Sequence, residues 1–182
     1  MSEPSLEVAI LDAAAADDAE LMSAITTIIN DVYAVAEHGL WTEGAKRTTV
    51  EEVQAITRAG QLVVARAGAT IAGSVRIQRL GPDLSEFGML AVAFDHRSTG
   101  VGRQLVEFVE QRSRDAGHTT MQLELLVPRE WTHPSKAALD KWYSRIGYRR
   151  VRTGVIDEAY PQLAPLLATP CDFAVYHKQL GA

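Results

Sequence analysis

Residues 86–106 read EFGMLAVAFDHRSTGVGRQLV, which is an apolar run, a turn with two glycines and the start of a helical pattern. We expect a strand over 86–93 and an amphipathic helix over 101–116. Glycine lets a backbone approach a bulky anion closely, and the first amides of a helix lack acceptors within the helix itself. This order of elements therefore predicts a phosphate-binding site at the start of the helix.

The spacing of these glycines excludes two common nucleotide-binding motifs. A dinucleotide-binding fingerprint would place a third glycine where Leu105 stands, and a P-loop would need a Gly-Lys-Ser or Gly-Lys-Thr run that is absent. What remains is the pattern R-x-x-G-x-G, made by Arg97, Gly100 and Gly102. On its own this pattern also fits a simple turn before a helix, with Arg97 as a solvated surface residue.

A second motif lies about forty residues later, at 141–148, and reads KWYSRIGY. It ends a helix that we expect to begin near Pro134, because proline suits the first turn of a helix, and to stop before Gly147. Taken without the first motif, the aromatic pair Trp142 and Tyr143 would be interpreted as core packing.

The rest of the chain predicts one domain over 1–182, with strands and helices in an order that contains no repeat or linker. Three prolines between 156 and 173 favour a short helix or turn there. We expect strands near 7–11, 61–66, 71–80, 86–93, 119–127, 151–156 and 173–178, and helices near 17–36, 49–60, 101–116 and 133–147.

The composition narrows the classes of partner and compartment. The chain has 18 Lys and Arg against 23 Asp and Glu, a net charge of −5, which disfavours nucleic acid and is compatible with a cationic acceptor. The single cysteine, Cys171, has no partner for an internal disulfide, and no His/Cys spacing suggests a metal. Residues 1–12 lack the features of a leader, and no uncharged run approaches 20 residues. We therefore expect a cytoplasmic protein with no metal and no membrane partner.

The two motifs and the order of elements resemble the GCN5-related N-acetyltransferases, the GNAT superfamily, over most of the chain. The resemblance implies an α/β (α+β) fold, with a mixed and mostly antiparallel sheet of about seven strands flanked by about four helices. It also implies acetyl-CoA as co-substrate, with its pyrophosphate on the amides of residues 98–103 and its pantetheine arm against the preceding strand. The implied coenzyme-binding residues are Leu90, Val92, Arg97, Ser98, Thr99, Gly100, Val101, Gly102 and Arg103.

The resemblance also implies a role for the second motif. In many members its tyrosine lies near the thioester sulfur, which makes Tyr143 the candidate general acid. A thiolate whose parent thiol has a pKa near ~8.5 needs only modest help to leave. Seven residues before this tyrosine the family often has Asn, whereas this chain has Lys136, which would reach a phosphate or be solvated.

A base is expected because an alkylammonium group must lose a proton before it attacks a thioester. Glu86 lies six residues before Val92, the spacing at which the histone-acetylating branch of the family places its catalytic glutamate. Strand alternation predicts that Glu86, Gly88, Leu90 and Val92 share one face, although a β-bulge, common in this strand of the family, would change that phase. A carboxylate at the rim is the alternative for Glu86, and Glu124 is the second candidate base.

No residue presents itself as a covalent nucleophile. We therefore expect an N-acetyltransferase that moves the acetyl group of acetyl-CoA to the primary amine of a small molecule, by direct attack in a ternary complex. Two alternatives stay open: a non-catalytic acyl-CoA-binding regulatory module, and an acetyltransferase for protein N-termini or lysines. Dimers are frequent in the family, so a homodimer is possible. Candidate residues for the acceptor pocket are Tyr33, Trp41, Glu43, Trp131 and His133.

Overall fold

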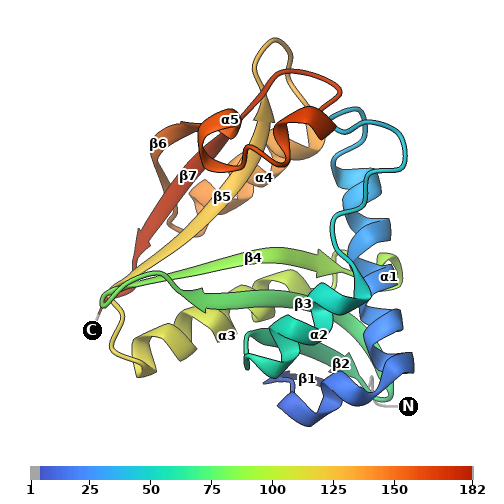
Figure 1. Cartoon of the computed structure of the whole chain (residues 1–182). Helices are drawn as coiled ribbons and strands as arrows, with labels where there is room; N and C mark the ends of the chain where they lie inside the picture. The colour runs from blue at the N-terminus through green and yellow to red at the C-terminus, as the bar shows by residue number, and fades with distance from the viewer. Residues whose placement is uncertain (1–4, 182) are drawn as a thin grey trace.

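The computed structural model describes residues 5–181 as a seven-stranded sheet with helices on both faces (Figure 1). The order across the sheet is β1-β2-β3-β4-β5-β7-β6. The strands are β1 (Leu6–Ile10), β2 (Leu62–Ala67), β3 (Thr70–Arg79), β4 (Leu84–Val92), β5 (Thr120–Pro128), β6 (Arg149–Val155) and β7 (Cys171–Gln179).

Helices and strands follow one another in the predicted order, and the expected mixed, mostly antiparallel sheet of seven strands is confirmed. The predicted short helix or turn before the last strand is also present, as α5 and η3. The helices are α1 (Ala19–Ala36), α2 (Val50–Arg58), α3 (Val101–Asp115), α4 (Pro134–Arg145) and α5 (Ile156–Ala159), and the 3₁₀ helices are η1 (Ala13–Asp17), η2 (Phe94–His96) and η3 (Ala164–Leu166).

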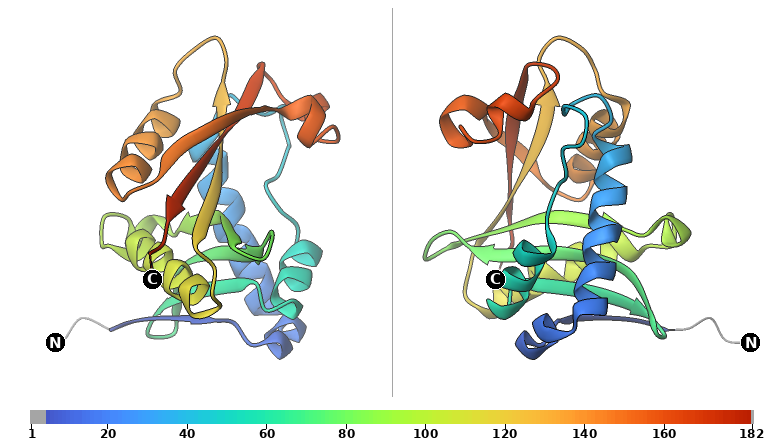
Figure 2. Two further views of the ribbon diagram at one scale, coloured as in Figure 1. Left: turned by 90° about the vertical axis from the view of Figure 1, so that its left-hand side faces the viewer. Right: turned by 45° about the vertical axis from the view of Figure 1, so that its right-hand side comes forward.

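The two faces of the sheet are covered by different helices (Figures 1 and 2). Helices α3 and α4 pack on one face, which we call the coenzyme face, over a buried cluster that includes Phe87, Leu105 and Tyr143. Helices α1 and α2 cover part of the other face, which we call the acceptor face, over a cluster that includes Ile25 and Met89. Helix α5 lies on this second face too, over Phe173 and Val175 of β7.

One neighbouring pair of strands is parallel, and that pair separates soon after it forms. Strand β4 pairs with β5 only from Leu84 to Glu86, opposite Thr120 to Gln122. Beyond this point β4 pairs with β3 and β5 pairs with β7, so the two strands diverge (Figure 1). We call this place the β4–β5 divergence. It separates β1–β4 from β5–β7 and leaves one edge of each middle strand without a strand partner.

A β-bulge in β4 overturns the prediction that Glu86, Leu90 and Val92 share a face. Ser74 of β3 pairs with Ala91 and Arg76 pairs with Gly88, so two residues of β4 lie opposite one residue of β3. Met89, inside the bulge, has a φ of 52°. The extra residue inverts the alternation, so Met89 and Ala91 pack on the acceptor face, whereas Leu90 and Val92 pack on the coenzyme face. Glu86, before the bulge, is therefore on the acceptor face.

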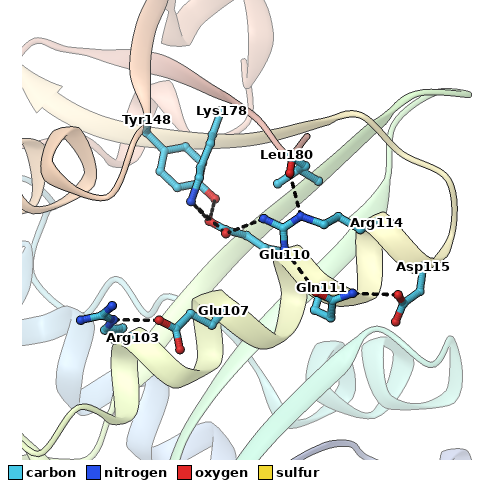
Figure 3. A network of polar contacts seen from close by, with 9 residues as sticks. All are labelled: Arg103, Glu107, Glu110, Gln111, Arg114, Asp115, Tyr148, Lys178 and Leu180. Carbon is cyan, nitrogen blue, oxygen red and sulfur yellow. Dashed lines mark hydrogen bonds and ion pairs between the residues drawn. The ribbon is translucent and has the colours of Figure 1, made fainter. Parts of the chain in front are cut away.

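Helix α3 is fixed to the end of the sheet by a buried carboxylate (Figure 3). Glu110 is 4% exposed. It accepts the Tyr148 hydroxyl at 2.8 Å and the Lys178 ammonium at 2.9 Å. In the next turn, Arg114 Nε donates to the Leu180 carbonyl at 2.7 Å. These contacts join the second half of α3 to Lys178 of β7, to Leu180 and to Tyr148, the residue before β6.

Within residues 5–181, no helix has the length and apolar character that crossing a membrane requires.

Candidate functional site

The turn before α3 presents a row of open backbone amides. Ser98 has a φ of 63°, and Gly100, the N-cap of α3, has a φ of 86°. In the described part of the chain, the amides from Ser98 to Arg103 have no hydrogen-bond acceptor, and the next one, Gln104 N–H, donates to Gly100 O at 3.0 Å. Six consecutive donors at the positive end of a helix fit a pyrophosphate group.

The glycines of this turn serve different purposes. A Cβ at Gly100 would meet no atom within 4 Å, so its positive φ, and not lack of space, favours glycine there. A Cβ at Gly102 would lie 3.4 Å from Val92 Cγ2 and 4.0 Å from Trp142 Cη2. Gly102 therefore marks the place where the end of β4, the first turn of α3 and the last turns of α4 meet.

The side chains of the turn lie mostly on its surface. Thr99 Oγ1 donates to the His96 carbonyl at 2.6 Å and so shapes the turn. The Arg97 guanidinium lies over the exposed Phe94 ring, 4.3 Å from its centre. Arg103 Nε donates to Glu107 at 2.8 Å. The backbone, and not these side chains, is thus the feature of the turn that suits a phosphate.

The edge of β4 at the divergence offers further backbone groups. Ala93 N–H donates to Ala72 O on β3 at 2.9 Å. Because backbone groups alternate in direction along a strand, those of Val92 point to the opposite edge, where β5 is no longer paired. This arrangement suits a polar chain such as pantetheine. Leu90 lies two residues earlier, beside the bulge.

Tyr143 belongs to the aromatic core, and among the described residues its hydroxyl makes no hydrogen bond. Its ring lies 6.1 Å from Phe87, 6.0 Å from Tyr148 and 4.9 Å from Trp142, and the residue is 5% exposed. Among the described residues the hydroxyl has no hydrogen-bond partner, unlike that of Tyr148. Burial raises the pKa of the Tyr143 phenol far above its usual value, and Tyr33 adds a smaller increase. The phenol is therefore a neutral donor at every ordinary assay pH.

Glu86 lies on the acceptor face in a chain of four polar side chains that crosses four strands. Its carboxylate accepts the amide of Gln78 at 2.8 Å and that of Gln122 at 2.7 Å. The oxygen of Gln122 accepts in turn from His177 Nε2 at 2.8 Å. Burial and the nearby Arg152 lower the pKa of His177, so its ring is neutral near pH 7 with the proton on Nε2. Both oxygens of Glu86 are thus already hydrogen-bonded, and they lie where β4 and β5 are still paired.

Glu124 lies two residues beyond Gln122 on the same face of β5. One of its oxygens accepts the Tyr160 hydroxyl at 2.6 Å. Burial raises the pKa of Glu124, the charge of Glu86 raises it further, and the Tyr160 hydrogen bond and Arg152 oppose the shift. Sequence patterns had no means of finding Tyr160, because it follows a four-residue helix in an irregular segment.

The comparisons with known proteins agree with this geometry. The family model described as "Acetyltransferase (GNAT) domain" matches residues 58–150, just over half of the chain. This protein belongs to the GNAT acetyltransferase family. The match contains α3 with its open amides, both diverging strands and Tyr143, so the GNAT protein is an acyltransferase that uses acetyl-CoA.

Solved structures confirm the GNAT fold at low sequence identity. One is yncA, a putative acetyltransferase from Salmonella typhimurium that was solved with its cofactor acetyl-CoA. The alignment covers 97% of this chain and 94% of that chain, at 16% identity and a TM-score of 0.66. The alignment with an aminoglycoside 6'-N-acetyltransferase complexed with coenzyme A covers 97% of this chain and 98% of that chain, at 15% identity and a TM-score of 0.67. The alignment with the ribosomal-protein-S18-alanine N-acetyltransferase from Escherichia coli covers 98% of this chain and 96% of that chain, at 16% identity and a TM-score of 0.66. A search of curated protein sequences finds no match.

Lys136 has a different role in this GNAT protein from either one expected. It is 5% exposed, and its ammonium lies 2.6 Å from Glu37 Oε1 at the end of α1. The second oxygen of Glu37 accepts Trp41 Nε1 at 2.6 Å. The ammonium is therefore neither solvated nor free for a phosphate, because a buried carboxylate already neutralises it.

The other candidate acceptor residues lie in different surroundings. Tyr33 lies on the acceptor side with Arg47 5.2 Å above its ring. His133 instead joins two loops, since its Nδ1 caps α4 and its Nε2 lies 3.0 Å from His38 O. Trp131 Nε1 donates to Thr169 at 3.1 Å. Glu43 is exposed.

Two surface hollows lie away from the turn at residues 97–103. One of about 350 Å³ and one of about 410 Å³ share Arg129, whose guanidinium pairs with Asp172 at 2.6 Å. The larger one includes Trp131, Thr132 and His133. Neither hollow contains Tyr143, Glu86 or a residue of the turn. The described residues also contain no group of three His, Cys, Asp or Glu side chains placed to hold a metal ion.

Proposed function

We propose that this GNAT acetyltransferase transfers the acetyl group of acetyl-CoA to the primary amine of a small molecule, by direct attack in a ternary complex. The observation that supports the coenzyme site most strongly is the row of six open amides at the start of α3, beside the divergence of β4 and β5. Tyr143, Glu86 and Glu124 lie around the same divergence and supply the groups that the reaction needs.

In this mechanism the amine nitrogen bonds to the acetyl carbon as the carbon–sulfur bond breaks. A carboxylate on the acceptor face takes the proton of the amine, and Tyr143 stabilises the departing thiolate. Since the pKa of the buried Tyr143 phenol lies above that of a thiol, near ~8.5, we expect hydrogen-bond donation and not complete proton transfer.

The burial of Cys171, the one cysteine of the chain, favours direct attack over a covalent acetyl-enzyme. Cys171 is buried at the start of β7, and burial raises the pKa of its thiol to about 11. Such a thiol is a poor nucleophile at neutral pH, because the thiolate is the reactive form.

A small acceptor is favoured by contacts that bridge the two halves of the molecule on the acceptor side. Thr42 N–H, between α1 and α2, donates to Leu166 O at 2.8 Å, and Ala168 N–H donates to Leu40 O at 2.9 Å. Trp41 and Leu167 form an isolated β-bridge between them. A polypeptide crossing the acceptor face would meet these bridged loops, whereas a small amine would not.

The first experiment titrates the purified protein with acetyl-CoA by calorimetry, beside Gly100→Glu and Gly100→Ala. Both substitutions impose the same backbone strain at a φ of 86°, and only glutamate adds bulk and negative charge beside the amides. We expect the parent and Gly100→Ala to bind and Gly100→Glu to lose at least tenfold in affinity.

A folded parent that does not bind acetyl-CoA would contradict the coenzyme site. If binding is found, a panel of small amines is assayed beside peptides with a free N-terminus or lysine. Turnover of peptides alone would favour the protein acetyltransferase alternative, and binding with no turnover of any amine would favour the regulatory module.

A further inference from the structure

The two carboxylates on the acceptor face differ in how their oxygens are occupied. Both oxygens of Glu86 accept side-chain amides, at 2.8 and 2.7 Å. Glu124 Oε2 accepts the Tyr160 hydroxyl at 2.6 Å, and within residues 5–181 its Oε1 has no hydrogen-bond partner. Glu124 therefore has one oxygen with no hydrogen bond at all, whereas each oxygen of Glu86 already accepts one.

The positions of the two carboxylates relative to the divergence also differ. Glu86 pairs in register with Gln122 in the last step where β4 and β5 are joined. Glu124 lies two residues further along β5, on the same face, where β5 pairs with β7 alone. Its side chain is thus next to the edge that the divergence opens, whereas that of Glu86 is at the closed end.

Tyr160 is fixed by contacts that do not involve Glu124. Its ring packs edge to face on Phe173, with the ring centres 5.5 Å apart and an angle of 68°. Its amide donates to Ile156 O at 2.8 Å at the end of α5. Because the ring is held independently, its hydroxyl determines where Glu124 Oε2 lies and leaves Oε1 for another partner.

The charges around Glu124 come from three strands, the segment after α5 and a loop. Burial raises the pKa of its carboxyl, with Glu86 adding to the increase, and Tyr160 and Arg152 lowering it. A carboxylate with a raised pKa is a better proton acceptor than an ordinary one. The charged or titratable groups that face this region are Glu86 of β4, His177 of β7, Arg152 of β6, Tyr160 after α5 and Arg47 of the α1–α2 loop.

We infer that Glu124 Oε1 takes the proton of the acceptor's ammonium group, that Tyr160 is the positioning residue for Glu124, and that Glu86 supplies only fixed negative charge. This inference rests on the proposed function. In the step, one N–H bond of R–NH₃⁺ breaks and one O–H bond forms on Glu124. The products are a neutral carboxyl and an amine whose lone pair is free to attack, and the proton later leaves to water.

The kinetic test measures thiol release from saturating acetyl-CoA with butylamine as the probe, as kcat/KM for the amine from pH 5 to 10. In the parent we expect kcat/KM to fall at low pH, which gives the profile an acidic limb. In Glu124→Gln we expect this limb to be lost and kcat/KM on the plateau to be lower by at least about 100-fold. Tyr160→Phe keeps the ring packing but removes a hydrogen bond that favours the ionised carboxyl, so the limb moves to higher pH. Glu86→Gln keeps the limb but moves it to lower pH, because the charge of Glu86 raises the pKa of Glu124.

The matched control is Tyr176→Phe. The Tyr176 hydroxyl also donates to a carboxylate, that of Asp140, but on the coenzyme face. This variant loses the same kind of hydrogen bond in the same sheet, and we expect its limb to be unmoved. A limb that survives Glu124→Gln, or that disappears in Glu86→Gln, would overturn the inference.

A binding measurement keeps the inference testable even if butylamine is not acetylated. Carbon-13 NMR of the glutamate carboxyl groups, without acetyl-CoA, should show one resonance with a raised pKa that is absent in Glu124→Gln. We expect this resonance to shift on addition of butylammonium chloride and not of tetramethylammonium chloride, which has no N–H to donate. A resonance that does not shift on addition of butylammonium chloride would refute the role of Glu124. The shift without any acetyl transfer would refute the proposed function alone.

Discussion

Tyr143 combines two roles in one residue, because its ring and its hydroxyl face different surroundings. The ring completes a buried aromatic group with Phe87 and Tyr148. The hydroxyl of Tyr148 is used by Glu110, whereas that of Tyr143 has no partner among the described residues. The fully buried side-chain oxygens that lack a partner in the described residues are those of Ser74 and Ser113, and the Tyr143 oxygen is not one of them. The Tyr143 hydroxyl is therefore accessible and free to donate to a ligand.

We predict that Tyr143→Phe lowers kcat by about 10- to 100-fold, equivalent to the loss of one hydrogen bond of about 1.4–2.7 kcal/mol in the transition state. Affinity for acetyl-CoA should change by less than about twofold. Steady-state kinetics and calorimetry measure the two quantities. Tyr148→Phe is the control, and it should lower the melting temperature but not kcat. Normal turnover with a large loss of coenzyme affinity would exclude the role given to Tyr143.

At the scale of elements, the start of α4 is joined to the end of α1 by charge. Lys136 and Glu37 are 5% and 7% exposed, and they form an ion pair of 2.6 Å. Helix α1 carries Tyr33 and α4 carries Tyr143, so this contact fixes the spacing between the acceptor side and the coenzyme side. Such pairs stabilise little by themselves, but removal of one partner leaves an uncompensated buried charge.

We predict that Lys136→Met lowers the free energy of unfolding by about 3–5 kcal/mol, because Glu37 would keep only the Trp41 hydrogen bond. Urea denaturation followed by circular dichroism measures this value. Arg58→Met is the matched control, since the Arg58–Asp17 pair is 55% and 80% exposed and should matter by less than about 1 kcal/mol. Equal effects of the two substitutions would show that the buried pair is not formed.

At the scale of the whole molecule, the sheet consists of two parts joined by a short parallel contact and by loops. Three residue pairs connect β4 to β5. A coenzyme that binds β4, the start of α3 and α4 together would add contacts between the two parts. Its binding should therefore appear as stabilisation of the complete fold and not of one half.

We predict that acetyl-CoA at about 100 times its Kd stabilises the protein by about 2.7 kcal/mol, which raises Tm by about 5–10 °C for a chain of this length. Differential scanning calorimetry measures the shift at several concentrations. Gly100→Ala should show a similar shift and Gly100→Glu almost none. Two separate transitions, with only one of them moved by acetyl-CoA, would contradict the coupling of the two parts.

Local signals explain which parts of the site could be predicted. The turn at 97–103 was placed correctly because glycine and the first turn of a helix depend on neighbouring residues alone. The bulge at Met89 was not placed, because a non-glycine residue at a φ of 52° has no sequence signature. Lys136 was misjudged for a different reason. Its partner Glu37 is 99 residues away, and no pattern in the sequence connects them.

The sequence by itself determined the order of elements, the family and the position of the turn at 97–103. These follow from hydrophobic periodicity, helix capping and backbone freedom over a few residues. The tertiary structure decided that Glu86 is already occupied by two amides and that Tyr160 holds Glu124. It also decided that Lys136 is neutralised and that the loops after α1 and α5 meet. Each of these depends on side chains brought together from distant segments, and only the packing of the sheet and its helices determines which of them come within hydrogen-bond distance.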